Sequence, residues 1–409
     1  MGELPKIISV DDHVVEPPHL WDRWLPERFR DRGPRSERRG IGAMRHIAGG
    51  VYEQSFDPEG PPADCWVYED LVYVNKRHVA AVGFARDDMT MSPITYEEMR
   101  PGCYDPVERV KDMALNHVEA SLCFPTFPRF CGQTFSEGKD RDLGLACVRA
   151  YNDWMVEEWC GDSNGALIPL TIVPLWDAEL AAVEVRRNAA RGVHAVCFSE
   201  IPFHLGLPSI HTDYWDPFFA ACQETRTTIN MHIGSSSRMP ATSPDAPVAV
   251  AATLSFNNSM ASLSDWLFSG KLVQFPELVL AYSEGQIGWL PYILERADTV
   301  WEQHRAWGGV ADIVPEPPST YYYRQVYGCF FSDFHGLKAL DEVGVDNITF
   351  ETDYPHTDST WPHTKAIAEK MVTGLPDDAI YKIMRGNAIR MLSLDLDADR
   401  DEAGNLTKA

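Results

Sequence analysis

Short apolar runs, separated by longer amphipathic segments, recur along most of the chain. Most runs are apolar throughout and do not alternate with polar residues, which predicts strands buried on both faces of a sheet. The intervening segments repeat their apolar residues with the spacing of helices that cover such a sheet. The eight expected strands cover residues 7–10, 120–124, 166–173, 194–198, 228–233, 278–282, 328–331 and 348–351.

The segments between these strands carry recognisable helix signals. One expected helix begins at Asp105 and Pro106, because Asp is a favoured N-cap and Pro is favoured at the first helical position. Others are expected at 180–190, 217–223, 263–269 and 377–392. Strands that alternate with helices predict a parallel sheet, and eight such units favour a closed (β/α)8 barrel of the TIM type. An open, doubly wound sheet is the alternative fold.

The domain organisation follows from the spacing of these units. The chain has 409 residues, of which 44% are hydrophobic, so one large barrel with insertions accounts for its length. We expect the barrel to occupy residues 1–394 and to include an insertion at 20–104, between the first and second strands. A connection of that length is expected to be a functional lid or to carry structure of its own. Residues 395–409 are polar and acidic, and we expect a disordered tail.

Charge and cysteine content exclude several classes of function. The net charge is -24, from 60 acidic and 36 basic residues, and such a surface repels nucleic acid and anionic membranes. The nine cysteines form no CxxC pair, which argues against a disulfide framework or a zinc-thiolate cluster. The first residues lack the apolar segment of a signal peptide, so we expect a cytoplasmic protein.

Metal-ligand residues stand at several strand ends. In a parallel barrel, active-site residues gather at the carboxyl ends of the strands. Asp11 and His13 follow the first expected strand and face the same way, because side chains alternate along extended chain. Other ends carry His232 (fifth strand), Glu284 (sixth), and Asp353 with His356 (eighth). Any one of these residues alone is more often a turn residue, but their coincidence predicts a site for divalent zinc, manganese or iron.

Several motifs resemble one family over most of the chain. They are SVDDHVVEPP at 9–18, RVKDM at 109–113 leading to CFP at 123–125, YNDW at 151–154, ETDYPH at 351–356 and GNA at 386–388. The chain resembles the amidohydrolase-related (amidohydrolase 2) family, which includes aminocarboxymuconate-semialdehyde decarboxylase and the aromatic-acid decarboxylases. The resemblance implies a distorted (β/α)8 barrel whose metal ligands are Asp11, His13, His232 and Asp353. It also implies a homodimer or larger oligomer. An assembly with a related chain is the alternative.

Two departures from the family pattern leave the number of metal ions open. Decarboxylase members carry a His after the sixth strand that activates the metal-bound water, where this chain has Glu284. In addition, Glu16 and His356 lie near the implied ligands in the sequence, and such a set would suit two ions about 3.5–4 Å apart. The chain thereby resembles branches of the family that hold a dinuclear iron centre and activate oxygen. Asp12 and Glu16 are alternatives to Asp11 as a ligand.

Three functions follow as hypotheses. The first is metal-dependent hydrolysis or decarboxylation of a small, carboxylated substrate, with Asp353 as ligand and proton shuttle and Glu284 or His356 as base. The second is a dinuclear iron or manganese monooxygenase in which Glu16, Glu284 and His356 are additional ligands. The third is a non-catalytic, metal-binding subunit of a paired complex. The sequence identifies neither the substrate nor the metal.

Overall fold

Eight parallel strands form the centre of the computed structural model, which describes residues 3–48 and 51–396. They pair in two sheets, with the order β1-β6-β7 in one and β12-β11-β10-β9-β8 in the other. The strands are β1 (Ile7–Val14), β6 (Val118–Pro125), β7 (Leu167–Ile168), β8 (Ala195–Cys197), β9 (Thr228–His232), β10 (Leu280–Ser283), β11 (Val326–Phe330) and β12 (Ile348–Phe350).

Backbone contacts at both seams join the two sheets into one barrel. A parallel bridge between Thr171 and Val196 links the segment after β7 to β8. At the other seam, the Asp353 N–H donates to the Asp11 carbonyl at 3.0 Å, and the His13 N–H donates to the Tyr354 carbonyl at 2.6 Å. The expected (β/α)8 barrel is therefore confirmed, and the open doubly wound sheet is wrong.

The barrel departs from the expected strand bounds at two places. β7 has two residues instead of the expected eight at 166–173, so this part of the wall is irregular. β1 runs to Val14, four residues beyond the expected end at residue 10. Asp11 and His13 consequently lie within the strand: His13 pairs with Phe124 of β6, and the Asp11 carbonyl accepts the Asp353 N–H.

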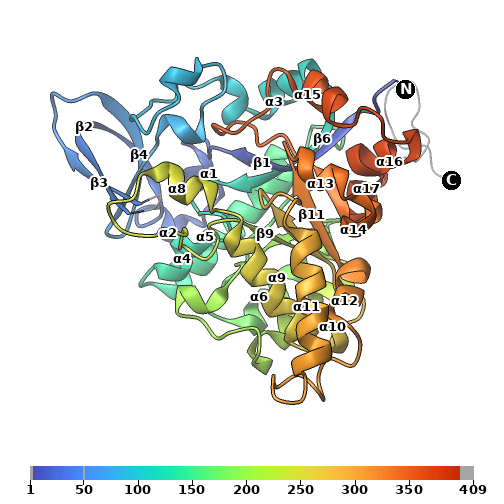
Figure 1. Ribbon diagram of the computed structural model, residues 1–409. Helices are drawn as coiled ribbons and strands as arrows, with labels where there is room; N and C mark the ends of the chain where they lie inside the picture. Colours follow the sequence, from blue (N-terminus) through green and yellow to red (C-terminus); the bar gives the residue numbers. More distant parts are fainter. Residues whose placement is uncertain (1–2, 49–50, 397–409) are drawn as a thin grey trace.

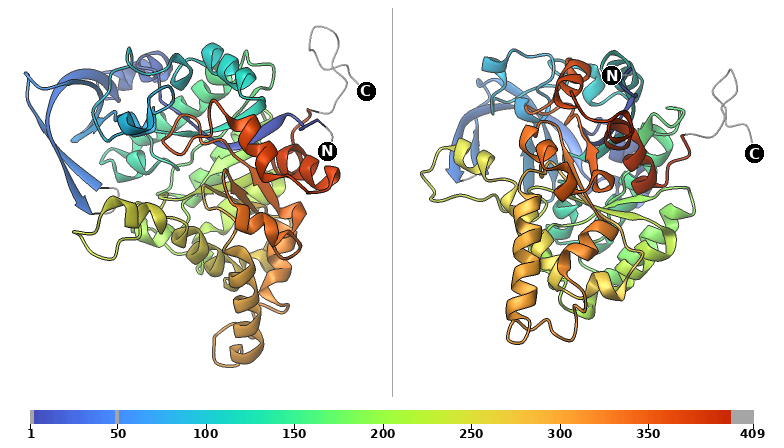
Figure 2. Two further views of the ribbon diagram at one scale, coloured as in Figure 1. Left: turned by 45° about the horizontal axis from the view of Figure 1, so that its top comes forward. Right: turned by 45° about the vertical axis from the view of Figure 1, so that its right-hand side comes forward.

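Helices surround the barrel (Figures 1 and 2). The longer ones are α3 (Pro106–Leu115), α5 (Arg141–Trp154), α6 (Ala178–Ala189), α7 (Asp216–Thr225), α9 (Asn257–Phe268), α11 (Leu290–His304), α12 (Pro318–Gln325) and α15 (Thr364–Met371). Shorter ones are α4 (Gln133–Glu137), α8 (Val248–Thr253), α10 (Lys271–Gln274), α13 (Phe334–Lys338), α14 (Leu340–Val343), α16 (Asp377–Tyr381) and α17 (Asn387–Leu392). The Asp105 side chain accepts the Glu108 N–H and Pro106 follows it, which confirms the expected start of α3.

The chain between β1 and β6 forms a small sheet at one side of the barrel (Figure 1). It contains α1 (Leu20–Trp24), α2 (Glu27–Arg30), β2 (Arg35–Ala48), β3 (Val51–Phe56), β4 (Pro62–Tyr68) and β5 (Leu71–Val74). The four strands are antiparallel in the order β3-β2-β4-β5. The Trp66 ring of β4 packs against Trp21 and Phe127 at centroid distances of 4.9 and 5.4 Å, which joins this sheet to the barrel core.

Two remaining expectations concern the outer parts of the chain. The domain boundaries at 1–394 and 20–104 stay predictions. Of the expected tail at 395–409, residues 397–409 lie outside the described residues. Within the described ranges, no helix is long and apolar enough to cross a membrane.

Candidate metal centre

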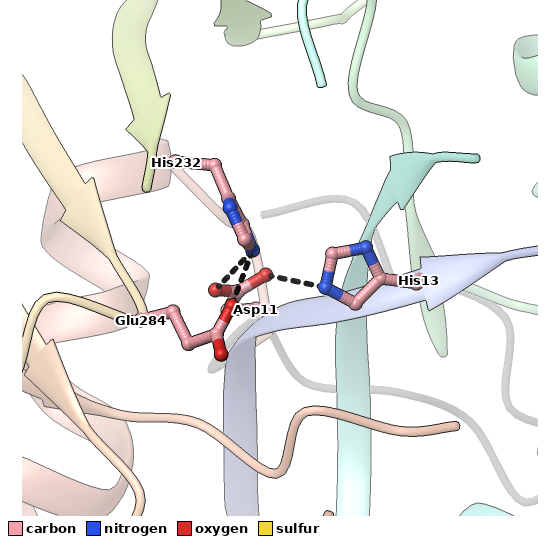
Figure 3. Close-up of side chains that lie close together, drawn as sticks. All are labelled: Asp11, His13, His232 and Glu284. Carbon is pink, nitrogen blue, oxygen red and sulfur yellow. Dashed lines mark ion pairs between the residues drawn. The ribbon is translucent and has the colours of Figure 1, made fainter. Parts of the chain in front are cut away.

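Four side chains converge inside the carboxyl end of the barrel (Figure 3). Asp11 and His13 come from β1, His232 ends β9, and Glu284 follows β10. Each offers one ligand atom, and these atoms all lie within 4.8 Å of one another. The His232 Nε2 atom is 3.4 Å from Asp11 Oδ2 and 3.1 Å from Glu284 Oε2. The His13 Nε2 atom is 3.5 Å from Asp11 Oδ1, so one ion can contact all four residues.

A second group of ligand atoms overlaps the first. It consists of His13, Glu284, Asp353 and His356, again within 4.8 Å of one another. Asp353 Oδ1 lies 3.2 Å from His13 Nε2 and 3.0 Å from His356 Nδ1. The structure thus brings together six of the seven residues that the sequence nominated as ligands, in two groups that share His13 and Glu284.

Backbone contacts fix the imidazole of His232 for coordination. Its Nδ1 lies 2.6 Å from the Ile233 carbonyl oxygen, so Nδ1 carries the hydrogen and Nε2 presents a lone pair to the cluster. The Phe130 ring stacks on this imidazole at 4.0 Å between centroids and holds its plane. On the other side of the cluster, His13 stacks on His356 at 3.6 Å.

The carboxylates after β10 and β12 are held by unusual backbone conformations. Glu284 has φ 58° and Asp353 has φ 50°, both in the left-handed region that non-glycine residues rarely adopt. Each such residue costs about 1 kcal/mol or more, and such strain clusters at functional sites. The backbone of both residues is therefore shaped to turn a carboxylate into the barrel.

Several buried polar atoms of the cluster lack hydrogen-bond partners within the described residues. They are both carboxylate oxygens of Asp11 and of Asp353, both ring nitrogens of His13, and Nε2 of His232. All four residues are at most 1% exposed. Buried charges are normally paired or coordinate metals, because isolation from water otherwise costs several kcal/mol. A divalent cation would satisfy these atoms together, so the residues fit a metal.

The protonation of the cluster follows from its burial. Burial raises the pKa of Asp11, and the charge of Glu351 raises it further; burial and the charge of Glu284 do the same for Asp353. Burial lowers the pKa of His13 and brings that of His356 to about 4, so both imidazoles are neutral at neutral pH. Without a cation, several carboxylates crowd one dry space, which favours protonation of some of them.

Glu284 keeps its charge within this crowd. Burial acts to raise its pKa, but the neighbouring imidazoles of His232 and His356 outweigh burial and lower the pKa. Its N–H donates to Glu351 Oε2 at 3.0 Å, which fixes the strained backbone. Glu284 is thus an ionised carboxylate that belongs to both ligand groups.

Glu16 lies outside both groups, although the sequence nominated it as a ligand. Its two carboxylate oxygens accept the N–H groups of Thr126 and Phe127 at 2.9 and 2.8 Å. Burial raises its pKa to about 7. The structure therefore places Glu16 where it fixes the loop after β6.

Asp12 also points away from the ligand groups. Its carboxylate accepts hydrogen bonds from Ser9 Oγ at 3.0 Å, Thr352 Oγ1 at 2.6 Å, the Tyr354 N–H at 2.9 Å, and Ser121 Oγ. Because side chains alternate along β1, Asp12 contacts the neighbouring strands while Asp11 and His13 face inward. Of the two candidates at this end of β1, the structure brings Asp11 to the cluster.

A third group, which the sequence did not nominate, lies beside the first. Glu351 and Cys329 offer ligand atoms within 4.8 Å of Asp11. The Cys329 thiol donates to Glu351 Oε2 at 2.5 Å, and burial raises the pKa of this thiol, which keeps it protonated and a poor ligand. Glu351 stands two residues before Asp353. This spacing could have predicted from the sequence that both side chains face the barrel interior.

The ligand groups open into a cavity of about 380 Å³. Barrel residues at its wall include Phe130, Ile233 and Met239, beside His13, His232, Glu284, Asp353 and His356. The segment between β1 and β6 supplies the remaining wall with Tyr52, Tyr73, Lys76, His78, Val79 and Met91. These individual wall residues were not predicted from the sequence, because they depend on how the insertion folds back over the barrel.

Comparison with known proteins places this barrel in a family. The family model described as Amidohydrolase matches residues 19–394, which is most of the chain. The chain belongs to the amidohydrolase family. This confirms the family resemblance deduced from the motifs. No curated protein matches this amidohydrolase significantly.

Solved structures share the fold of this amidohydrolase at low sequence identity. An amidohydrolase from Mycobacterium avium subsp. paratuberculosis K-10 is 20% identical, with a TM-score of 0.65 and coverage of 95% of this chain and 99% of that one. A dihydroxybenzoic acid decarboxylase from Polaromonas sp. JS666, with bound manganese and the inhibitor 2-nitroresorcinol, is 17% identical, with a TM-score of 0.62 and coverage of 96% and 98%. A manganese-bound 5-carboxyvanillate decarboxylase mutant from Novosphingobium aromaticivorans DSM 12444 is 15% identical, with a TM-score of 0.63 and the same coverage.

Proposed function

We propose that this amidohydrolase is a metal-dependent enzyme that hydrolyses or decarboxylates a small organic acid. The observation that carries the proposal is the buried group of Asp11, His13, His232 and Glu284 at the base of a cavity, with polar atoms that lack partners among the described residues. The manganese in the similar decarboxylase structures supports a divalent ion in this position.

The residues around the ion would each have a separate role in the reaction. A bound divalent ion polarises a substrate oxygen and lowers the pKa of a coordinated water. Asp353 lies 3.0 Å from the neutral His356, and this pair can move a proton between its oxygen and Nδ1. Glu284, ionised and part of both ligand groups, is placed to accept a proton from water or substrate.

A dinuclear oxygenase is the second candidate function. The observation that favours it is the overlap of the two ligand groups at His13 and Glu284. A carboxylate has two oxygens and can contact two cations at once, so Glu284 could belong to two ions of iron or manganese about 3.5–4 Å apart. The His-and-carboxylate donor set suits these ions as well as zinc.

Metal content separates the two candidates. The purified protein is incubated with manganese or iron, freed of excess ion and analysed for metal per chain. We expect about one ion per chain for the hydrolase or decarboxylase. Near two ions per chain, together with turnover that requires O2, would replace the first candidate with the oxygenase.

The variant Glu284→Gln tests the role of the carboxylate directly. If Glu284 is the proton acceptor, the variant keeps its metal and turnover falls by about 10²–10⁴-fold. If Glu284 bridges two ions, the metal content of the variant falls as well. Glu295→Gln, at an exposed position on α11, is the matched control and should change neither property.

A further inference from the structure

Lys76 is a partly buried cation that faces the metal cluster from the insertion. It follows β5 and lines the same cavity as the ligand groups. Within the described residues, no carboxylate oxygen lies within 4.0 Å of its ammonium nitrogen; the Tyr73 ring lies 5.3 Å from that nitrogen. By contrast, Arg129, the other cation of the cavity, contacts Glu137 at 2.7 Å. Among the described residues, Lys76 therefore lacks the carboxylate that would balance its positive charge in this partly buried position.

The backbone holds Lys76 in this place. Lys76 forms an antiparallel bridge with Pro93, and the Arg77 N–H donates to the Ser92 carbonyl at 2.8 Å. The side chain thus extends into the cavity from ordered, paired backbone. Burial lowers the pKa of Lys76, as expected for an ammonium removed from water without a partner.

The space between Lys76 and the ligand groups is lined mainly by aromatic and apolar side chains. Tyr52, Tyr73, Val79, Met91 and Phe130 contribute to the wall. Such a wall suits a flat or apolar body, since small-molecule sites are mostly apolar with a few placed polar groups.

His78 links the two ends of the cavity. Burial, followed by the influence of Lys76 and His356, lowers its pKa to about 3, so His78 is neutral; all three side chains line the same cavity. Its buried Nδ1 has no hydrogen-bond partner within the described residues. A neutral imidazole can donate to or accept from a ligand that spans this space without adding charge.

We infer that Lys76 binds a carboxylate of the substrate that is separate from the group that reacts at the metal ligands. The substrate class is then a small, largely apolar or aromatic molecule with one carboxylate that survives the reaction. This inference deepens the proposed function and rests on it, because it assumes that the reacting group lies at the ligand cluster. Lys76 acts as a specificity-determining residue.

Matched acids and amides test the inference. Benzoate, phenylacetate and 3-phenylpropanoate, each with its neutral amide, are titrated into the manganese-loaded protein by calorimetry. We expect at least one acid to bind the wild type about tenfold or more tightly than its amide, because only the acid offers a charge to Lys76. In Lys76→Met and Lys76→Gln this preference should disappear. Lys139→Met, which removes an exposed lysine that pairs with Asp70, should retain it.

A second measurement does not depend on any ligand. Because Lys76→Met removes a partly buried cation that has no carboxylate partner among the described residues, the ligand-free variant should unfold at a higher temperature than the wild type, whereas Lys139→Met should not. The inference is overturned if no acid binds more tightly than its amide, or if the preference survives in both Lys76 variants. Loss of manganese binding by the wild type would instead contradict the proposed function, so the two failures are distinguishable.

Discussion

At the scale of single residues, one backbone contact determines what His232 can do. The Nδ1–H donates to the Ile233 carbonyl oxygen, which lies 2.6 Å from Nδ1. The free lone pair is therefore on Nε2, which points at Asp11 and Glu284. The same imidazole stacks on Phe130 and cannot easily rotate away. Its position at the end of β9 made it recognisable in the sequence, whereas the stacking ring came from a loop distant in the chain.

His232→Ala is expected to abolish metal binding, because it removes a nitrogen ligand that the cluster cannot replace. Loss of more than about 100-fold in affinity for manganese is expected, since disturbance of the groups that merely orient such ligands already costs 10–100-fold. Metal content after gel filtration measures it. His211→Ala, at an exposed histidine that pairs with Asp265, is the control. Wild-type metal content in the His232 variant would remove this residue from the ligand set.

Metal affinity should fall as the pH is lowered. The raised pKa values of Asp11 and Asp353 mean that protons compete with the cation well above the ordinary carboxyl pKa of about 4. The imidazole of His356 adds little to this competition above about pH 4, and that of His13 adds little near neutral pH, because burial lowers both pKa values. The manganese dissociation constant at neutral pH and at about pH 5 measures the effect. An affinity that stays constant down to about pH 4 would contradict the assignment.

At the scale of elements, the alternation of side chains along β1 gives neighbouring residues different roles, as possible metal ligands or as contacts to adjacent strands. Asp11 and His13 face the cluster, and Asp12 faces the strands on either side. The motif DDH was visible in the sequence, and the alternation of side chains favoured Asp11 together with His13. Asp12 stayed an alternative, because the choice depends on where the strand ends and how it pairs. The structure extends β1 to Val14, pairs Asp12 and His13 with β6, and joins the Asp11 carbonyl to the Asp353 N–H.

Asp12→Ala should destabilise the barrel without removing a ligand. The carboxylate accepts hydrogen bonds from Ser9, Ser121, Thr352 and the Tyr354 N–H, so its loss leaves several buried donors without an acceptor. A decrease of about 3 kcal/mol in the free energy of unfolding is expected. Urea denaturation of the metal-free protein measures it. Asp312→Ala, at an exposed aspartate, is the control, and an equal change in both variants would refute this role.

The sequence predicted regular elements better than irregular ones. Strand identity and order followed from apolar runs, which depend on local composition. The small sheet of the insertion was not predicted in detail, and neither was its contribution of Lys76 and His78 to the cavity. Those features depend on contacts between distant segments, such as Trp21 with Trp66, which periodicity does not encode.

At the scale of the whole molecule, a bound cation would join parts of the chain that are far apart in sequence. Its ligands come from β1, β9 and the segments after β10 and β12. Because the unfolded chain does not present these atoms together, metal binding would contribute to folding stability.

Manganese should therefore raise the thermal stability of the metal-free protein. At a free concentration about 100 times the dissociation constant, the gain is about 2.7 kcal/mol. Thermal unfolding followed by circular dichroism, with and without manganese, measures the shift of the midpoint. The His232→Ala variant should show no shift, and an equal shift in that variant would mean that the ion binds elsewhere.

The seam between β1 and β12 has a consequence for biosynthesis. Asp11 lies in the first barrel strand, and its carbonyl accepts the N–H of Asp353, which follows the last barrel strand, so the ribosome makes one side of this seam long before the other. A nascent chain that lacks the final strand has neither a closed barrel nor the carboxylate of Asp353. Complete ligation of a cation by these residues would therefore wait until the last barrel strand has been made, and metal loading would follow synthesis of the whole barrel.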